Sequence, residues 1–330
     1  MNITVLGAGA WGTALAAALA QRHDVRLWAR DRELAATLDT TRHNERYLPG
    51  IELPPVLRCT AEFGAAVAHC RHGLLLIATP TAALRDLLRQ LRATGELPPV
   101  VWLCKGLERS SAAMAHEIVR DELGGHPAGP LSGPSFAQEV ARGLPTALTV
   151  AGDDSLCHLV TRTLHGPSLR IYSTHDVTGV EVGGAVKNVM AIATGICDAL
   201  ALGHNARAAL ITRGLAEMTR FGVALGAQAA TFMGLTGVGD LILTCTGELS
   251  RNRQVGLMLG GGLPLAESLA RLGHVAEGVW SAAAVQRRAA SLGVQMPITE
   301  GVCAVLEERV SPRQALDRLL ARDPKREALS

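Results

Sequence analysis

The N-terminal segment most constrains the fold of this 330-residue chain. An apolar strand, Asn2–Leu6, leads directly into Gly7-Ala8-Gly9-Ala10-Trp11-Gly12, and helical periodicity follows over Trp11–Gln21. In a strand–turn–helix unit with this spacing, the first glycine allows a tight turn, the second lets backbone approach a pyrophosphate, and the third lets helix and strand pack closely. The helix start adds unpaired N–H groups and the positive end of its dipole. The segment therefore predicts a dinucleotide site that contains Gly7, Gly9 and Gly12.

Short apolar runs alternate with helical stretches over the first 180 residues, the pattern of parallel strands joined by crossover helices. The region that follows Asp39, with Pro49 and Gly50, is predicted to be an irregular connection. From Glu181 onward Ala- and Leu-rich helical stretches dominate. We therefore expect an α/β chain: a mostly parallel, Rossmann-type sheet domain over 1–180 and an all-α domain over 181–330. The predicted strands are Asn2–Leu6, Val25–Ala29, Gly73–Ala78, Val100–Cys104, Gly129–Ser132, Thr146–Val150 and Leu169–Tyr172.

The composition excludes several classes of protein. With 32 Lys and Arg against 30 Asp and Glu, and only four Trp, two Tyr and four Phe, the chain lacks the features of a nucleic-acid binder.

Its seven scattered cysteines form no Cys-x-x-Cys pair, which indicates reduced thiols of a cytoplasmic protein and no metal site. The long apolar stretch Gly183–Gly203 contains Lys187, Asn188 and Asp198, each costly in lipid, so no membrane span is expected.

The end of the second predicted strand bears on the choice of cofactor. NAD sites usually place an acid there for the ribose 2′-hydroxyl, whereas this chain has Ala29 and then Arg30. An arginine at this point suits a 2′-phosphate, so NADP(H) is favoured. Asp31, the next residue, keeps NAD(H) open as the second cofactor.

Two further segments follow predicted strands and so fall at the carboxyl edge of the sheet, where ligands of open α/β folds bind. Lys105 comes directly after Val100–Cys104, and Gly133-Pro134-Ser135 follows the strand that ends at Ser132. A lone loop lysine is as readily a solvated surface charge, but this position makes Lys105 a site candidate.

The predicted helix around Gly183–Thr194 is apolar nearly all round, yet it contains Lys187 and Asn188. Burying these groups costs free energy unless they have partners or a chemical task. Burial also lowers the pKa of a lysine toward the range useful for proton transfer, so Lys187 is predicted to be catalytic. The alternative is a lysine whose ammonium reaches the surface past its alkyl stem. Asp198 shares its face but lies three turns away, too far to pair with it.

A third polar cluster combines Asp240, which follows two glycines, with Ser250-Arg251-Asn252 at the start of another helix. Helix capping is the simple explanation of Asp240. The hydroxyl, guanidinium and amide of the triplet, together with helix N–H groups, form a good site for a phosphate. We therefore expect a phosphorylated small-molecule substrate.

These segments together resemble the bacterial-type NAD(P)-dependent glycerol-3-phosphate dehydrogenase family. The resemblance extends over nearly the whole chain in family order, and it is strongest at Gly183–Asn188. The matching blocks are Gly7–Gly12, Lys105–Glu108, Ser132–Ala137, Gly183–Asn188, Asn205–Gly214, Gly237–Cys245, Ser250–Asn252 and Val275–Gly278.

The resemblance implies reversible reduction of dihydroxyacetone phosphate to sn-glycerol 3-phosphate for phospholipid biosynthesis, in a Rossmann domain followed by a domain like the C-terminal domain of 6-phosphogluconate dehydrogenase. It implies that Lys187 exchanges the proton and that Asp240 and Lys105 assist. The implied substrate residues are Lys105, Gly133, Ser135, Lys187, Asn188, Asp240, Thr244, Ser250, Arg251 and Asn252. The implied cofactor residues are Gly7, Gly9, Ala10, Trp11, Gly12, Arg30, Lys105, Ala137, Arg251, Val275 and Glu277.

Chemical reasoning agrees with this mechanism, since a lysine ammonium can protonate the developing alkoxide without a metal. Lys105 and Arg251 are expected to lower the Lys187 pKa, and Asp240 to orient the lysine and oppose that lowering. A homodimer is compatible with the sequence. Two alternatives remain open: a related β-hydroxyacid dehydrogenase, and a dinucleotide sensor without catalytic activity.

Overall fold

The computed structural model describes residues 1–273 and 276–321. They divide into two compact units, the first made of Met1–Cys104 and Ala115–Val177, the second of Lys105–Met114 and the chain from Thr178 onward. The elements of the first unit are β1 Asn2–Leu6, α1 Ala10–Ala20, β2 Asp24–Trp28, α2 Arg32–Thr41, β3 His43–Asn44, β4 Leu48–Glu52, β5 Arg58–Thr60, α3 Phe63–His69, β6 Leu74–Ile77, η1 Thr81–Ala83, α4 Leu84–Arg92, β7 Val100–Trp102, α5 Ala115–Leu123, β8 Ala128–Ser132, α6 Ala137–Ala141, β9 Thr146–Ala151, α7 Asp154–Leu164 and β10 Leu169–Thr174.

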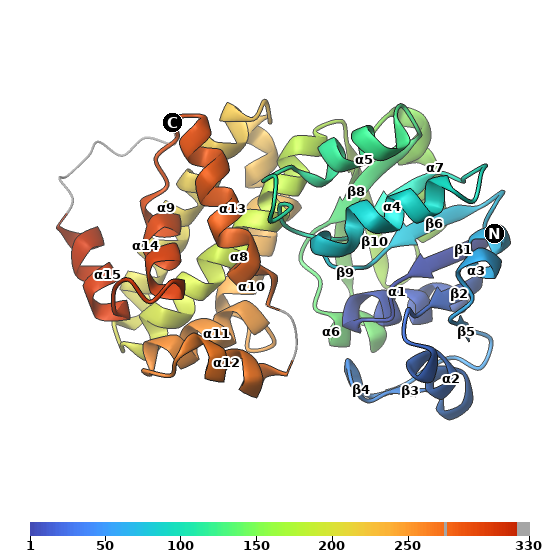
Figure 1. Ribbon diagram of the computed structural model, residues 1–330, viewed down its shortest axis with the longest axis horizontal. Helices are drawn as coiled ribbons and strands as arrows, with labels where there is room; N and C mark the ends of the chain where they lie inside the picture. The colour runs from blue at the N-terminus through green and yellow to red at the C-terminus, as the bar shows by residue number, and fades with distance from the viewer. Residues whose placement is uncertain (274–275, 322–330) are drawn as a thin grey trace. The chain divides into compact units, whose positions relative to one another are not determined.

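The first unit is a sheet of eight strands in the order β10-β9-β8-β7-β6-β1-β2-β5. Every neighbouring pair is parallel except β8 and β9, so the expected mostly parallel, Rossmann-type sheet is confirmed. Helices α4 and α5 cover one face, and α1 and α6 cover the other (Figure 1). The Leu-Leu-Leu-Ile run of β6 is buried on both faces, as a central strand of a covered sheet requires.

The strand register aligns the carboxyl ends of the central strands. Leu6 of β1 pairs with Trp28 of β2 and with Ile77 of β6, and Ile77 pairs with Trp102 of β7. The residues that follow these strands, including Gly7 and Arg30, therefore lie along one edge of the sheet, where open α/β folds bind ligands.

Three features of the first unit differ from the prediction. The region after residue 39 is ordered rather than irregular: β3 and β4 form an antiparallel hairpin, and β5 joins the sheet edge beside β2. β3 has two residues and β5 three, so they leave little periodicity to detect, and β4 contains Pro49 and Gly50, which are typical of loops. Helix α7 was not predicted, although Asp153 caps its start by accepting a hydrogen bond from the Leu156 N–H at 2.7 Å.

The second unit is helical throughout its described residues, as expected. Its elements are α8 Val177–Ala199, α9 Gly203–Ala224, η2 Ala229–Met233, η3 Leu235–Gly239, α10 Asp240–Thr246, α11 Arg251–Gly260, α12 Leu265–Leu272, α13 Glu277–Ser291, α14 Pro297–Leu306 and α15 Pro312–Leu320. The segment Lys105–Met114, which separates β7 from α5 in sequence, contributes Leu107, Ala112 and Met114 to the hydrophobic core of this unit.

Helix α8 is the central element of the second unit. By length and composition it could cross a membrane, but its apolar window is entirely buried within the protein, as in a core helix. Its buried residues run from Gly179 to Cys197 without interruption. A helix surrounded on all sides needs apolar side chains all round, which explains why its hydrophobic pattern has no polar face.

Candidate active site

Asp240 is the centre of the candidate site in the second unit. Its side chain is fully buried, and each of its two carboxylate oxygens meets a lysine. Lys105 donates to Oδ2 from 2.9 Å, and Lys187 forms an ion pair with Oδ1. The hydroxyl of Thr244, one turn further along α10, lies 3.4 Å from Oδ1. Asp240 thus forms ion pairs instead of serving as a simple helix cap, and the structure brings together four of the predicted site residues.

The electrostatics of this cluster bring the pKa of Lys187 close to neutrality. Burial lowers the pKa of the Lys187 ammonium from its ordinary value of 10.5 to about 7, and the positive charge of Lys105 contributes to the lowering. The carboxylate of Asp240 opposes it, as expected. Arg251, which was also expected to lower this pKa, is not among the groups that act on Lys187. A lysine tuned in this way can give up or accept a proton with little cost.

Close backbone contact explains how Asp240 reaches Lys187. A Cβ on Gly183 would lie 2.1 Å from the carbonyl oxygen of Thr236, so only glycine permits α8 and η3 to approach this closely. Lys187 comes four residues after Gly183, and Asp240 four residues after Thr236. Four residues are about one helical turn, so the contact at Gly183 is followed one turn later by the ion pair.

Asn188 and Asn252 connect the site to two further helices. Gly278, in the first turn of α13, donates its backbone N–H to Asn252 Oδ1 at 3.0 Å. A backbone N–H can only donate, so this contact fixes the orientation of the Asn252 amide. Asn252 then donates through Nδ2 to Asn188 Oδ1 at 2.9 Å. The nitrogen of the Asn188 amide has no hydrogen-bond partner among residues 1–273 and 276–321, so it is available to donate to a ligand.

The start of α11 has the predicted features of an anion site. Ser250 is its N-cap, and its hydroxyl accepts from the Arg253 N–H at 3.3 Å. Arg251 begins the helix with an exposed side chain, and Asn252 follows. The first N–H groups of a helix lack intrahelical partners, so they and the guanidinium can hold a phosphate together.

Glu277, the first residue of α13, is a carboxylate among positive charges. Burial raises its pKa to about 7, while Arg251, Lys105 and Lys187 oppose the rise. The backbone N–H of Lys105 also contacts it, which ties the segment Lys105–Met114 to α13. Val275, predicted to contact the cofactor, lies outside the described residues.

The glycine turn of the first unit fits a pyrophosphate. Gly7 adopts a φ of +119°, and a Cβ there would lie 2.9 Å from the Ala78 backbone, while one on Gly12 would lie 2.0 Å from the Gly7 oxygen. A Cβ on Gly9, by contrast, would meet nothing within 4 Å. The turn thus presents open space at Gly9 beside the N-terminus of α1, where a phosphate would accept backbone hydrogen bonds.

A side chain missed by the sequence argument supports this turn. Asn44 of β3 is buried and donates to the Ala8 carbonyl at 3.0 Å and to Thr13 Oγ1 at 2.8 Å. It belongs to the region expected to be irregular. No local pattern identifies it, because its partners are more than 30 residues away in the chain.

Asp31 and Arg30, which follow β2, differ in their surroundings. Asp31 caps α2 by accepting from the N–H groups of Glu33 and Leu34, at 3.0 and 3.2 Å. Its other oxygen lies 3.9 Å from the guanidinium of Arg46. Arg30 is exposed. The carboxylate nearest to the strand end is therefore already engaged in capping, with Arg30 and Arg32 beside it in the chain and Arg46 near it in space.

The remaining predicted residues of the first unit lie near the ends of β1 and β8. Ala10 and Trp11 begin α1, and Ala137 begins α6. Gly133 has a φ of +139°, and Ser135 donates to its carbonyl at 3.0 Å. These residues thus occupy the sheet edge predicted for them.

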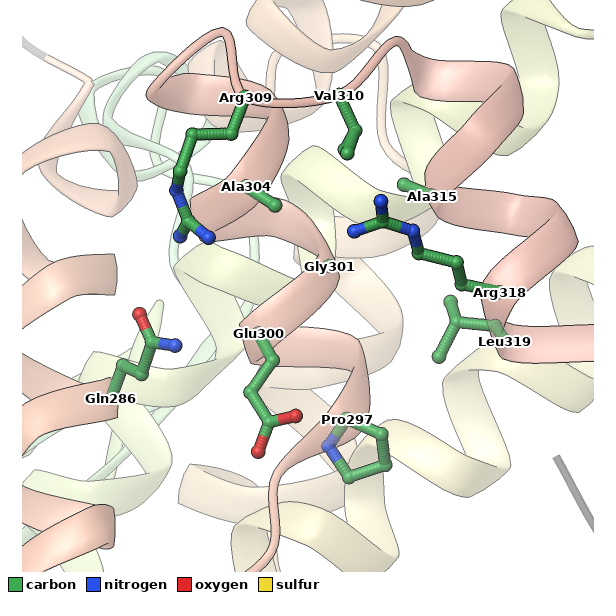
Figure 2. Close-up of a pocket in the computed structure, with 10 residues that line it drawn as sticks. All are labelled: Gln286, Pro297, Glu300, Gly301, Ala304, Arg309, Val310, Ala315, Arg318 and Leu319. Carbon is green, nitrogen blue, oxygen red and sulfur yellow. The ribbon is translucent and has the colours of Figure 1, made fainter.

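A cavity of about 290 Å³ lies between α13, α14 and α15 (Figure 2). It is lined by side chains such as Gln286 and Leu319, and by Arg309, whose Nε donates to Glu307 at 2.6 Å. None of the predicted site residues that the structure describes lines it.

A Rossmann-type unit with an open glycine turn, and a buried lysine with a lowered pKa on a carboxylate, define the class as a nicotinamide-dependent oxidoreductase. Two sequence-family models match the chain: the N-terminal part of NAD-dependent glycerol-3-phosphate dehydrogenase over residues 2–157, and its C-terminal part over residues 176–317. The chain therefore belongs to the NAD-dependent glycerol-3-phosphate dehydrogenase family.

Individual relatives agree with this placement. The chain is 58% identical to a glycerol-3-phosphate dehydrogenase [NAD(P)+] of Paucimonas lemoignei, over 100% of this chain and 99% of the relative. It is 59% identical to the protein of that name from Herminiimonas arsenicoxydans, over 99% of each. The crystal structure of glycerol-3-phosphate dehydrogenase from Coxiella burnetii superposes with a TM-score of 0.93 at 40% identity, over 97% of this chain and 98% of that chain.

Proposed function

We propose that this chain catalyses the reversible reduction of dihydroxyacetone phosphate to sn-glycerol 3-phosphate with NAD(P)H, and so supplies glycerophospholipid synthesis. The observation that carries the proposal is the pair of lysines on Asp240, in the same unit as the anion-binding start of α11. Reduction of a carbonyl requires a proton donor, and a phosphate binds to a helix start that carries positive charge. This unit contains both. The names of the relatives support the same substrate.

The residues of the chain divide the chemistry between them. When bound, the dinucleotide supplies a hydride to the carbonyl carbon of the substrate. The Lys187 ammonium gives its proton to the carbonyl oxygen as negative charge develops there, and Asp240 holds the ammonium in place. Lys105 adds a second positive charge that stabilises the same oxygen. In the reverse direction the neutral Lys187 amine accepts the proton from the hydroxyl.

We assign substrate binding to the predicted set. Arg251 and the start of α11, with Ser250 and Asn252, would hold the phosphate, and the Asn188 amide would donate to the substrate. Gly133, Ser135 and Thr244 are proposed as supports. The proposed cofactor residues are Gly7, Gly9, Ala10, Trp11, Gly12, Arg30, Lys105, Ala137, Arg251, Val275 and Glu277.

A preference for NADP(H) over NAD(H) is supported by the end of β2. An NAD site needs a carboxylate free to accept from the ribose 2′-hydroxyl, whereas Asp31 already accepts two backbone N–H groups. Arg30 is exposed at the strand end, and Arg46 lies near Asp31, so a 2′-phosphate would meet positive charge.

Three further assignments remain proposals. The domain division at 1–180 and 181–330 follows the change from strands to helices. A cytoplasmic location is supported by seven cysteines that are all free thiols, as in reducing compartments. A homodimer is proposed as the assembly.

Turnover by a Lys187→Ala variant tests the proposal. NADPH and NADH oxidation are measured with dihydroxyacetone phosphate and, in parallel, with a 3-oxo acid. We expect wild type to use the phosphorylated ketone, and the variant to bind NADPH but to lose at least about a hundredfold in kcat, the usual share of a general acid. Cys197→Ala, a buried change on the same helix, should keep turnover. Near-normal turnover by the lysine variant, or preference for the 3-oxo acid, would refute the assignment; no oxidation at all would favour the sensor.

A further inference from the structure

Helices α8 and α11 lie against each other in parallel register. Asn252, Gly256 and Gly260 are spaced by four residues on α11, and their neighbours on α8 include Asn188, Ile192 and Ile196, with the same spacing. A Cβ on Gly256 would lie 2.1 Å from the Ile192 oxygen, and one on Gly260 would lie 3.0 Å from the Ile196 oxygen. The two backbones therefore touch along two helical turns.

Gly195 completes this contact from the α8 side. Its Cβ would lie 2.2 Å from the carbonyl oxygen of Arg253 and 2.9 Å from the Gly256 Cα. With the register fixed by these glycines, Asn252 meets Asn188, the residue after Lys187. The anion-binding start of α11 is thereby held level with the proton carrier along α8.

One partly buried ion pair holds the first turn of α11 in this register. The Asp198 carboxylate accepts from Arg253 Nε at 3.1 Å and from its terminal nitrogen at 2.7 Å. The Arg253 backbone N–H is the group that the Ser250 hydroxyl caps. The Asp198 and Arg253 side chains are only 15% and 14% exposed, so solvent screens their attraction weakly.

Asp198 has a second partner that does not belong to α11. Arg207, on α9, donates to both of its oxygens, at 3.2 and 3.1 Å. The two arginines thus share one carboxylate but connect it to different helices. Without Asp198, two guanidinium groups would remain close together without their shared counter-ion, and repulsion would displace the first turn of α11.

We propose, on the basis of the function proposed above, that Asp198 is a positioning residue that acts through Arg253 to hold the start of α11 for the substrate phosphate. It touches neither substrate nor cofactor. Its effect arises because one small ligand must engage Lys187 with its carbonyl and the start of α11 with its phosphate. A small shift of one helix against the other spoils that fit.

Steady-state kinetics of Asp198→Asn with two ketones test the inference. Dihydroxyacetone phosphate carries the phosphate, whereas dihydroxyacetone, used at high concentration, lacks it. We expect the KM for the phosphorylated ketone to rise about tenfold with kcat within about threefold, and kcat/KM for dihydroxyacetone to stay unchanged. A loss confined to the phosphorylated substrate is not expected from general destabilisation, which lowers the active fraction for both.

Arginine variants supply the matched controls. Arg207→Gln removes the other half of the same cluster and should leave both KM values within about twofold, whereas Arg253→Gln should reproduce the effect of Asp198→Asn. The double variant Asp198→Asn with Arg253→Gln should be no worse than Asp198→Asn alone, since both changes break the same Asp198–Arg253 interaction. An unchanged KM in folded Arg253→Gln, or equal losses with the two ketones, would overturn the inference. A wild-type protein that fails to reduce dihydroxyacetone phosphate would refute the proposed function instead.

Discussion

Replacing Asp240 by asparagine should move the pH dependence of turnover in a direction set by the geometry of the two lysines. At the 2.9 Å between Lys105 Nζ and Asp240 Oδ2, and an effective dielectric constant of about 20, one ammonium–carboxylate pair corresponds to about 6 kcal/mol. The effect on a pKa is smaller, because relaxation of the protein and penetration of water weaken the interaction. Even a quarter of it, about 1.4 kcal/mol, lowers a pKa by about one unit.

The Lys187 pKa should therefore fall from about 7 to about 6 or below in Asp240→Asn, since the neighbouring Lys105 charge would no longer be offset. Reduction needs the ammonium, so its rate is lost as pH rises through this pKa. In the variant the rate of reduction should therefore fall at a pH at least about one unit lower than in wild type. Oxidation needs the neutral amine, so its rate should appear at a lower pH by the same amount.

The assay is kcat against pH in both directions, from pH 5 to 9, with thermal unfolding to confirm that the variant folds. Asp86→Asn, on the exposed Asp86 of α4, is the control and should leave both curves in place. If the pH at which kcat changes stays the same in Asp240→Asn, or moves to a higher value, Asp240 does not act on the proton carrier.

The remaining predictions concern the cofactor and stability. Arg30→Ala should raise the KM for NADPH about tenfold and leave the KM for NADH within about twofold. Arg32→Ala is the control, because Arg32 pairs with Glu62 at 3.4 Å. An unchanged KM for NADPH in Arg30→Ala would refute the role of Arg30 in binding the 2′-phosphate. Gly9→Ala should weaken NADPH binding at least tenfold, about 1.4 kcal/mol, because the added methyl group would enter the space for the pyrophosphate, and its thermal stability should be unchanged. Gly12→Ala should instead destabilise the fold. The Glu217 carboxyl accepts from the Ile298 N–H at 2.6 Å, and burial raises its pKa to about 7, above the 4.5 of a free glutamate. The stability that the neutral carboxyl contributes is therefore present below pH 4.5 and lost as pH rises through 7. Between pH 5 and 8, the free energy of unfolding of wild type, measured with denaturant, should fall by up to about 3 kcal/mol relative to that of Glu217→Gln. A difference that is independent of pH would contradict the raised pKa.

The glycine turn and the polar residues of α8 were predictable because each depends on local chemistry. Gly7 to Gly12 follow a strand at fixed spacing, and a lysine in an apolar helix is conspicuous. A further signal was available: the chain has only three lysines among its 32 Lys and Arg residues, and two of them meet at Asp240. Lysine, unlike arginine, has a pKa that burial can bring to neutrality, so lysines in an arginine-rich chain indicate proton transfer.

Other parts of the structure depend on contacts between residues far apart in the chain. Asp198 was correctly excluded as a partner of Lys187, but its partner Arg253 is 55 residues away and could not be identified from spacing. Asn44 supports the glycine turn from β3, a strand of only two residues. The antiparallel pairing of β8 and β9 also leaves no local signal, because both strands are largely buried.

The excursion of Lys105–Met114 limits how this protein can be dissected. The chain passes from the first unit to the second after Cys104, returns at Ala115, and enters the second unit again after Val177. A gene fragment that begins at Thr178 would encode every helix from α9 onward, yet it would lack Leu107, Ala112 and Met114 from its core and Lys105 from Asp240. Expression of the helical half alone should therefore give an unstable polypeptide, and fusing residues 105–114 to it through a short linker is the design that restores its missing side chains.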